Sequence, residues 1–133
     1  MEETTYLFVY GTLLSNHRAH GYLDGCKFIG NATTKDSRYN MESYNGHFPM
    51  VFTEGTYKIK GEIYEIPKHL LSDLDYYEGY NGTQSSLYKR DYFNYILENG
   101  DKVEALMYYQ SENKDNIKSK INILEENRTY RWR

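Results

Sequence analysis

The amino-acid sequence predicts an α+β protein: a small mixed sheet that closes, or nearly closes, into a barrel, with a few short helices. Strand-like stretches outnumber helical ones, and one strand–helix–hairpin unit stands at the centre of the chain. The chain also contains sixteen tyrosines among 133 residues. Tyrosine favours strands and brings a hydroxyl to an apolar wall, which suits a barrel with a polar-lined pocket. Most of the sixteen are expected simply to occupy half-buried positions.

Length and charge narrow the possible classes of protein. The length predicts a single domain over residues 1–133. Sixteen Lys and Arg against nineteen Asp and Glu give a net charge of −3 without an acidic or basic block, which argues against a dedicated nucleic-acid surface. The C-terminal RTYRWR, Arg128–Arg133, could stack on bases. We expect it instead to be a strand or a docked tail.

Cysteine content and hydropathy indicate the cellular compartment of the protein. Cys26 is the only cysteine, so no intramolecular disulfide is possible. The N-terminus is acidic and then apolar for only a few residues, which does not fit a signal peptide, and no apolar run is long enough to span a membrane. We therefore expect a soluble cytoplasmic protein.

The first predicted element is a central strand over Thr5–Tyr10, whose nearly continuous apolar run is typical of burial on both faces. It stops at Gly11-Thr12. A strand that breaks at glycine exposes consecutive backbone N–H groups, which can hold a carboxylate or a phosphate. The alternative is an ordinary turn. The elements expected next are a short helix or ordered loop over Ser15–Leu23, one or two strands within Lys27–Tyr44, and a short apolar piece over Met50–Phe52.

Strict alternation predicts a half-buried strand over Tyr57–Ile66, in which Gly61 marks a bulge or a close approach of backbone. Further on, strands are predicted over Tyr88–Leu97 and Val103–Tyr109. The Asn99-Gly100 pair between them favours a hairpin turn. The remaining predictions are a loop over Tyr80–Ser86 and a modest amphipathic helix over Asn113–Glu126.

The central helix is predicted between Pro67, which suits the first helical position, and Gly79, which suits the position past the end. At about 100° per residue, Glu78 falls on the apolar arc, and the other members of that arc are Leu70, Leu71, Leu74 and Tyr77. Asp73, Asp75 and Tyr76 fall outside it. Burial and the negative end of the helix dipole would raise the pKa of Glu78, making it a candidate general base. Alternatively, the last turn frays and Glu78 rotates outward.

Two histidines, His17 and His20, have the i,i+3 spacing that a metal site could use. No third ligand is evident nearby, so the sequence predicts no metal site.

Several stretches together resemble the γ-glutamyl cyclotransferase-like family, in particular its AIG2-like and γ-glutamylamine cyclotransferase branch. The strongest part of the match is the combination of YGTL, LDxxEG and YxR at their separations in this chain. The matching pieces, in order, are FVYGTL (Phe8–Leu13), Asn16-His17-Arg18, Phe48-Pro49, GEIYEI (Gly61–Ile66), LDYYEGY (Leu74–Tyr80), Tyr88-Lys89-Arg90, the Ala105–Tyr109 strand and Trp132.

The resemblance implies a barrel-like fold whose pocket is floored by the YGTL turn, with Glu78 as the catalyst. It implies that the turn holds a glutamyl α-carboxylate and ammonium through Tyr10, Gly11, Thr12 and Leu13. Tyr88 would line the same pocket, and Arg90 would act as a structural ion-pair partner. The implied reaction releases 5-oxoproline and a free amine from a small γ-glutamyl compound. It requires no metal or cofactor, because the substrate supplies the nucleophile.

Two positions depart from the family pattern. Leu14-Ser15 stands where a basic residue and glycine are common after YGTL, and Met50 stands where a small residue is usual after Pro49. Met50 could reshape the pocket. These departures motivate an alternative, a catalytically silent member that binds a small anionic metabolite or a protein partner in the same pocket. The sequence does not indicate the oligomeric state.

Overall fold

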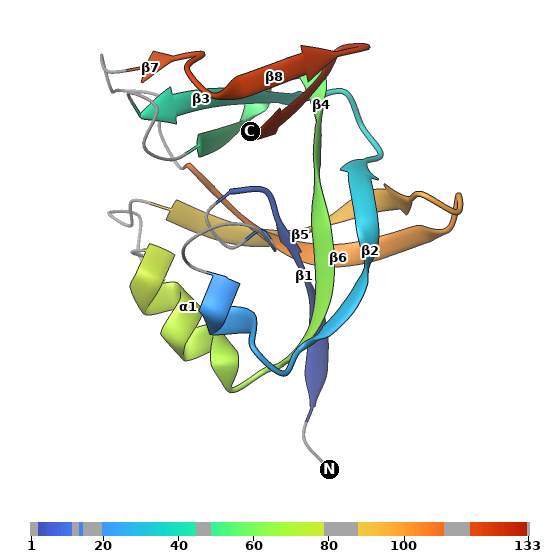
Figure 1. Ribbon diagram of the computed structural model, residues 1–133, viewed down its shortest axis with the longest axis vertical. Helices are drawn as coiled ribbons and strands as arrows, with labels where there is room; N and C mark the ends of the chain where they lie inside the picture. Colours follow the sequence, from blue (N-terminus) through green and yellow to red (C-terminus); the bar gives the residue numbers. More distant parts are fainter. Residues whose placement is uncertain are drawn as a thin grey trace.

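The structure is a computed structural model that describes residues 3–11, 14, 20–44, 49–78, 88–110 and 118–132. Within these residues the chain forms strands, one α-helix and one 3-10 helix (Figure 1). In chain order the elements are β1 (Thr4–Val9), η1 (His20–Leu23), β2 (Lys27–Thr34), β3 (Tyr39–Tyr44), β4 (Pro49–Pro67), α1 (Leu70–Glu78), β5 (Tyr88–Leu97), β6 (Lys102–Gln110), β7 (Lys118–Ser119), β8 (Ile123–Glu126) and β9 (Thr129–Trp132).

Five of the strands form a closed ring. β1 pairs in parallel with β6, and the ring continues through antiparallel pairs from β6 to β5, β2, β4 and back to β1. β4 is long enough to leave the ring and to pair with β3 and β9 in an upper layer (Figure 1). The prediction of a small mixed barrel-like sheet is confirmed.

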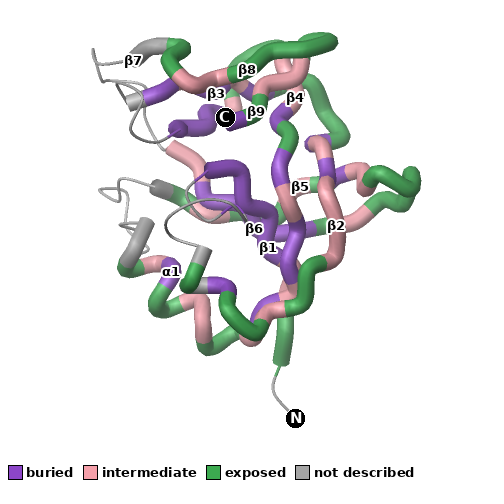
Figure 2. Tube along the Cα trace, in the orientation of Figure 1, coloured by how far each residue is buried: buried purple, intermediate pink, exposed green. Residues whose placement is uncertain are grey.

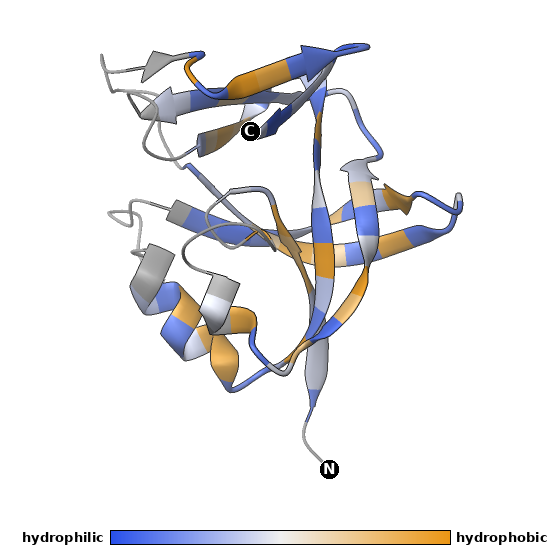
Figure 3. Ribbon diagram, in the orientation of Figure 1, coloured by the Kyte–Doolittle hydropathy of each residue, from blue (hydrophilic) through white to orange (hydrophobic). Residues whose placement is uncertain are grey.

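The core lies on both faces of β1, as its apolar sequence predicted. Leu7 and Val9 belong to a hydrophobic cluster that includes Leu74 of α1. Phe8, whose side chain points the other way, belongs to the second cluster with Ile63 and others. Figures 2 and 3 show buried and hydrophobic residues along β1 and the strands beside it. β1 therefore separates the two hydrophobic clusters, as do its neighbours β4 and β6.

β4 corrects one prediction, because the apolar piece Met50–Phe52 and the strand over Tyr57–Ile66 are parts of one strand of 19 residues. The pairing with β3 passes from Phe52 directly to Tyr57, so the residues between them form an irregularity within the strand. Gly55 permits it: a Cβ there would lie 2.3 Å from the Tyr39 carbonyl oxygen. The residues between Phe52 and Tyr57 are largely exposed. They therefore lack the alternation of apolar and polar residues that would have predicted a continuous strand.

The close approach predicted at Gly61 is confirmed. A Cβ on this residue would lie 2.2 Å from the carbonyl oxygen of Val9, and backbone cannot move out of its way cheaply. The hairpin predicted at Asn99-Gly100 is also confirmed, with Gly100 at φ 92° and the N–H of Leu97 donating to the carbonyl of Asp101 at 2.9 Å.

The helix begins later than its sequence predicts. Pro67 is the last residue of β4, paired with Thr4, and the N–H of Lys68 donates to the carbonyl of Glu3 at 2.9 Å. The ladder with β1 therefore extends through Pro67, and α1 starts only at Leu70. The apolar arc is confirmed where it is described: Leu74 is fully buried, and Leu70 and Leu71 pack on the same cluster. Gly79 and the predicted loop Tyr80–Ser86 lie outside the described residues.

The amphipathic helix predicted over Asn113–Glu126 is wrong in its described part, where β7 and β8 stand instead. Asn122, at φ 65°, turns the chain before β8, and Asn127 and Arg128, at φ 52° and 55°, make the turn into β9. The helical spacing of Ile121 and Leu124 is fortuitous, because both side chains are exposed. The C-terminal RTYRWR does form a strand, and its Trp132 is buried.

One polar atom in the interior stands out. The side chain of Tyr95 is fully buried and its ring stacks on Phe8 at 4.3 Å between centroids. Within the part of the chain that the structure describes, its hydroxyl has no hydrogen-bond partner. Burial, with a smaller contribution from Tyr39, raises the pKa of Tyr95 well above its usual value. This hydroxyl is thus desolvated without compensation, which is unfavourable for the folded state.

Replacing Tyr95 with Phe is expected to preserve or increase the free energy of unfolding, by up to about 1–2 kcal/mol, because it removes a buried unsatisfied group. Urea denaturation of the wild type and the variant measures this. The matched control is Tyr10→Phe, since the hydroxyl of Tyr10 is also buried but donates to the carbonyl of Tyr108 at 2.6 Å. Tyr10→Phe is expected to lose about 1 kcal/mol. An equal or larger loss in Tyr95→Phe would contradict the assignment of an unpaired hydroxyl.

Candidate functional site

The first part of the site is the turn at the end of β1. Tyr10 follows the strand and is buried, and its hydroxyl donates to the carbonyl oxygen of Tyr108. The N–H of Leu14 then donates to the carbonyl of Gly11 at 2.9 Å, which closes a turn. The predicted strand break at Gly11 is therefore confirmed. Thr12 and Leu13, which were also predicted to bind substrate, lie outside the described residues.

Pro49, the first residue of β4, covers Gly11. A Cβ on Gly11 would lie 2.6 Å from Cγ and 2.9 Å from Cδ of the Pro49 ring, which is closer than real Cβ contacts. Gly11 is buried under this ring. The close approach of the Pro49 ring therefore requires glycine at this position. This reason is independent of the predicted role of the backbone N–H groups. The sequence did not indicate this contact.

The second part of the site is the side of α1 that carries Asp75. The sequence placed Asp75 outside the apolar arc, yet its side chain is only 20% exposed. The hydroxyl of Tyr108 donates to Asp75 Oδ1 at 2.5 Å, and Nε of Arg90 lies 3.4 Å from the same oxygen. The structural ion pair predicted for Arg90 is confirmed, and Asp75 is its partner. Asp75 thereby fastens α1 to both β5 and β6.

Glu78 is the last residue of α1, and its side chain lies outside the described residues. In a helix, residues three apart lie on neighbouring positions of one side. Glu78 therefore comes slightly less than one helical turn after Asp75, in the last turn of α1. This spacing within LDYYEG is the signal that could have identified Asp75 from the sequence.

Tyr88, the other predicted site residue, is the first residue of β5 and pairs with Gln110; its side chain is outside the described residues. Arg90, the residue that contacts Asp75, stands two residues later in β5. Figure 1 shows the start of β5 beside the end of α1. Contacts among Tyr10, Tyr108, Asp75 and Arg90 thus link residues that stand one to three positions along the chain from Gly11, Glu78 and Tyr88.

Other candidate groups contribute less. Burial, and then the nearby Asp24, raise the pKa of the Cys26 thiol, which disfavours the nucleophilic thiolate. Among the described residues, no group of three or more His, Cys, Asp or Glu is arranged to hold a metal. His17 and the side chain of His20 lie outside that part of the chain. Across the residues described, no helix is both long and apolar enough to cross a membrane.

Comparison with known proteins shows the family to which the chain belongs. The model of the family described as "Gamma-glutamyl cyclotransferase, AIG2-like" matches residues 7–131. The chain belongs to this family. The match begins inside β1 and ends in β9, so it includes the turn at Gly11, all of α1 and the β5–β6 hairpin.

Individual members show how similar the chain is to its relatives. A protein of Methanocaldococcus jannaschii named "Putative gamma-glutamylcyclotransferase" is 36% identical over 109 residues, which cover 80% of this chain and 85% of that protein. A protein of Vibrio cholerae with the same name is 34% identical over 74 residues, covering 54% and 60%. The crystal structure of an AIG2-like protein from Mus musculus superposes with a TM-score of 0.71 at 25% identity, covering 84% and 81% of the two chains.

Replacing Asp75 with Asn is expected to lower the free energy of unfolding by about 1.5–3 kcal/mol, because a partly buried charged acceptor is lost to both Tyr108 and Arg90. The control is Asp73→Asn on the exposed side of the same helix, for which we expect a loss of less than about 0.5 kcal/mol. Urea denaturation compares the two. Equal losses would show that Asp75 is no more than a surface carboxylate.

Proposed function

We propose that this protein releases 5-oxoproline and a free amine from a γ-glutamyl compound, with Glu78 as the general acid and base. Family membership supports the reaction class. The observation that carries the proposal to particular residues is the double attachment of Tyr108. Its carbonyl oxygen accepts from Tyr10 at the end of β1, and its hydroxyl donates to Asp75 in α1, one helical turn before Glu78. These two hydrogen bonds link the residue before the turn to the last part of the helix, which supports a shared site.

The reaction is an intramolecular aminolysis. The α-ammonium of the glutamyl group first loses a proton. The amine nitrogen then attacks the γ-carbonyl carbon, so that a C–N bond closes the five-membered lactam. The bond from that carbon to the leaving nitrogen breaks. The attacking nitrogen gives up a second proton as it becomes the lactam N–H, and the leaving nitrogen gains two protons and departs as an ammonium. The protein has to fold the substrate chain and move the protons, while the nucleophile is already part of the substrate.

The turn after β1 is proposed to fold the substrate. Backbone N–H groups at Gly11, Thr12 and Leu13 would bind the α-carboxylate, and holding both ends of the glutamyl chain favours the near-attack shape. The Tyr10 hydroxyl donates to the carbonyl oxygen of Tyr108, which fixes the orientation of the ring, and this ring is proposed to line the pocket. Tyr88 is proposed to line the same pocket.

Glu78 is proposed to take the proton from the α-ammonium and to deliver one to the leaving nitrogen. The carboxyl end of a helix and an apolar neighbourhood both favour the protonated form of a carboxylic acid, which suits a group that must both accept and donate. Asp75 is bound to Tyr108 and Arg90 and acts as the anchor of the helix. The two carboxylates of LDYYEG are thereby given different roles.

Replacing Glu78 with Gln is expected to preserve the fold and to reduce 5-oxoproline release by at least about 10²-fold, because the amide cannot exchange the proton. The assay incubates the protein with a panel of γ-glutamyl amines and glutathione and measures 5-oxoproline. Asp73→Asn, exposed on the same helix, is the control and should retain the wild-type rate.

Turnover of the Glu78→Gln variant near the wild-type rate would refute the role of Glu78. If the wild type released no 5-oxoproline from any compound of the panel but bound another small anion tightly, the binding function would replace the enzymatic one.

A further inference from the structure

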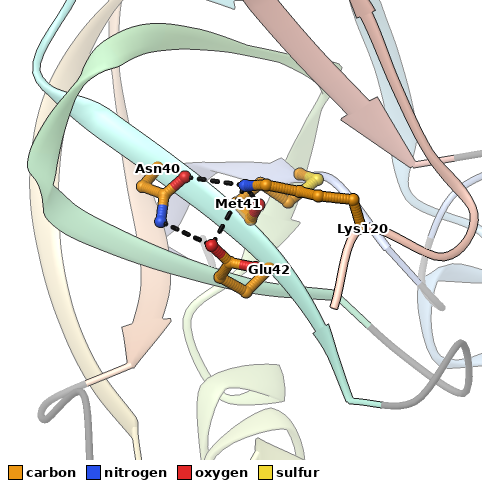
Figure 4. A network of polar contacts seen from close by, with 4 residues as sticks. All are labelled: Asn40, Met41, Glu42 and Lys120. Atoms are coloured by element: carbon orange, nitrogen blue, oxygen red, sulfur yellow. Dashed lines mark hydrogen bonds and ion pairs between the residues drawn. The ribbon is translucent and has the colours of Figure 1, made fainter. Parts of the chain in front are cut away.

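Lys120, which directly follows β7, has an ammonium group with an unusually complete set of partners. Its Nζ lies 3.0 Å from Asn40 Oδ1, 2.7 Å from the carbonyl oxygen of Met41 and 3.1 Å from Glu42 Oε1 (Figure 4). It also lies 4.3 Å from the centre of the Tyr130 ring. Three acceptors and one aromatic face match the three N–H groups and the charge of an ammonium.

Asn40, the Met41 carbonyl and Glu42 form a cage around the Lys120 ammonium, and a hydrogen bond within this cage fixes two of its members. The side-chain amide of Asn40 donates to Glu42 Oε1 at 3.1 Å, so the Asn40 oxygen is left to face Lys120 (Figure 4). The Glu42 side chain is only 17% exposed, whereas an ordinary surface carboxylate is largely hydrated. The acceptors converge on one point, which suits a compact ammonium better than the planar fork of a guanidinium.

Lys120 is also held at its backbone. The preceding β7 pairs with Ser43 and Tyr44 of β3, and the N–H of Ile123 donates to the carbonyl of Lys120 at 3.0 Å. The side chain therefore reaches along β3 from a fixed starting point. The Lys120 side chain joins the segment before β8 to the middle of β3, while β7 joins that segment to the end of β3.

The cage continues directly into the start of β4. Met41 pairs with Val51, Glu42 with Met50, and the next residue of β3 with Pro49. Pro49 is the residue whose ring covers Gly11. Contacts thus run from the Lys120 ammonium through β3 to Pro49 and from there to the turn at the end of β1.

We propose that Lys120 is a positioning residue for this turn: its ammonium fixes β3, and β3 holds Pro49 over Gly11. Its effect on turnover rests on the proposed function, but its effect on the position of Gly11 does not. An exposed ion pair by itself contributes little to stability. We therefore expect Lys120 to affect the position of the turn more than the free energy of unfolding.

The test replaces Lys120 with Met, which preserves the length of the side chain and removes its charge. The NMR signal of the Gly11 amide is expected to shift, because Pro49 moves relative to it. KM for a γ-glutamyl substrate is expected to rise by about tenfold while kcat changes less, since a misplaced binding turn weakens substrate binding. Lys120→Arg is expected to restore only part of the wild-type behaviour.

The matched control is Lys102→Met, at the exposed start of β6 far along the hairpin from the site (Figure 1). It should alter neither the Gly11 signal nor KM. Glu42→Gln weakens the cage while Lys120 remains, and it should shift both readouts in the same direction as Lys120→Met. This second variant decides the question if Lys120→Met does not fold.

An unshifted Gly11 amide with unchanged KM in Lys120→Met would overturn the proposal, and so would equal changes in Lys102→Met. A wild type without turnover would count against the proposed function alone. The Gly11 signal would still decide the role of Lys120.

Discussion

The site depends most directly on the attachment of Tyr108 at two points. Its backbone carbonyl accepts from Tyr10 and its hydroxyl donates to Asp75, whose second partner is Arg90. A strand, a helix and the neighbouring strand of a hairpin thereby share one polar junction at the edge of the apolar core. Hydrogen bonds to a carboxylate are stronger than those between neutral groups. The position of α1 relative to β1 is therefore set by a few polar contacts as well as by the packing of leucines.

Close approach of backbone is the second requirement of the fold. Gly61 lets β4 pass close to the end of β1, where a side chain would clash with the carbonyl oxygen of Val9, and Gly11 lets Pro49 lie on the turn. Stacked aromatic rings and cations join β9 to β4 in the upper layer. Tyr57 stacks on Tyr130 at 4.2 Å, with Arg128 over one ring and Lys120 over the other. Many of the tyrosines thus serve as polar or stacking contacts, beyond filling half-buried positions.

Local patterns predicted the elements that local forces determine. The apolar run of β1, the Asn99-Gly100 hairpin and the arc with Leu74 all follow from periodicity or turn chemistry. The errors arise where long-range pairing prevails: β1 holds Pro67 in the sheet, and β9 keeps β8 extended against its helical spacing. Asp75 was missed because its partners come from distant strands. The backbone of Gly11, Glu78 and Tyr88 lies in the predicted elements, while the direction of the Glu78 side chain stays a prediction.

We propose that the turn after β1 and the end of α1 form one substrate site. The most direct test is a crystal structure of the protein with 5-oxoproline, the proposed product. We expect its carboxylate to lie against the N–H groups that follow Tyr10, with the lactam ring within hydrogen-bonding reach of Glu78. Binding of 5-oxoproline elsewhere, with Glu78 turned to solvent, would contradict the claim.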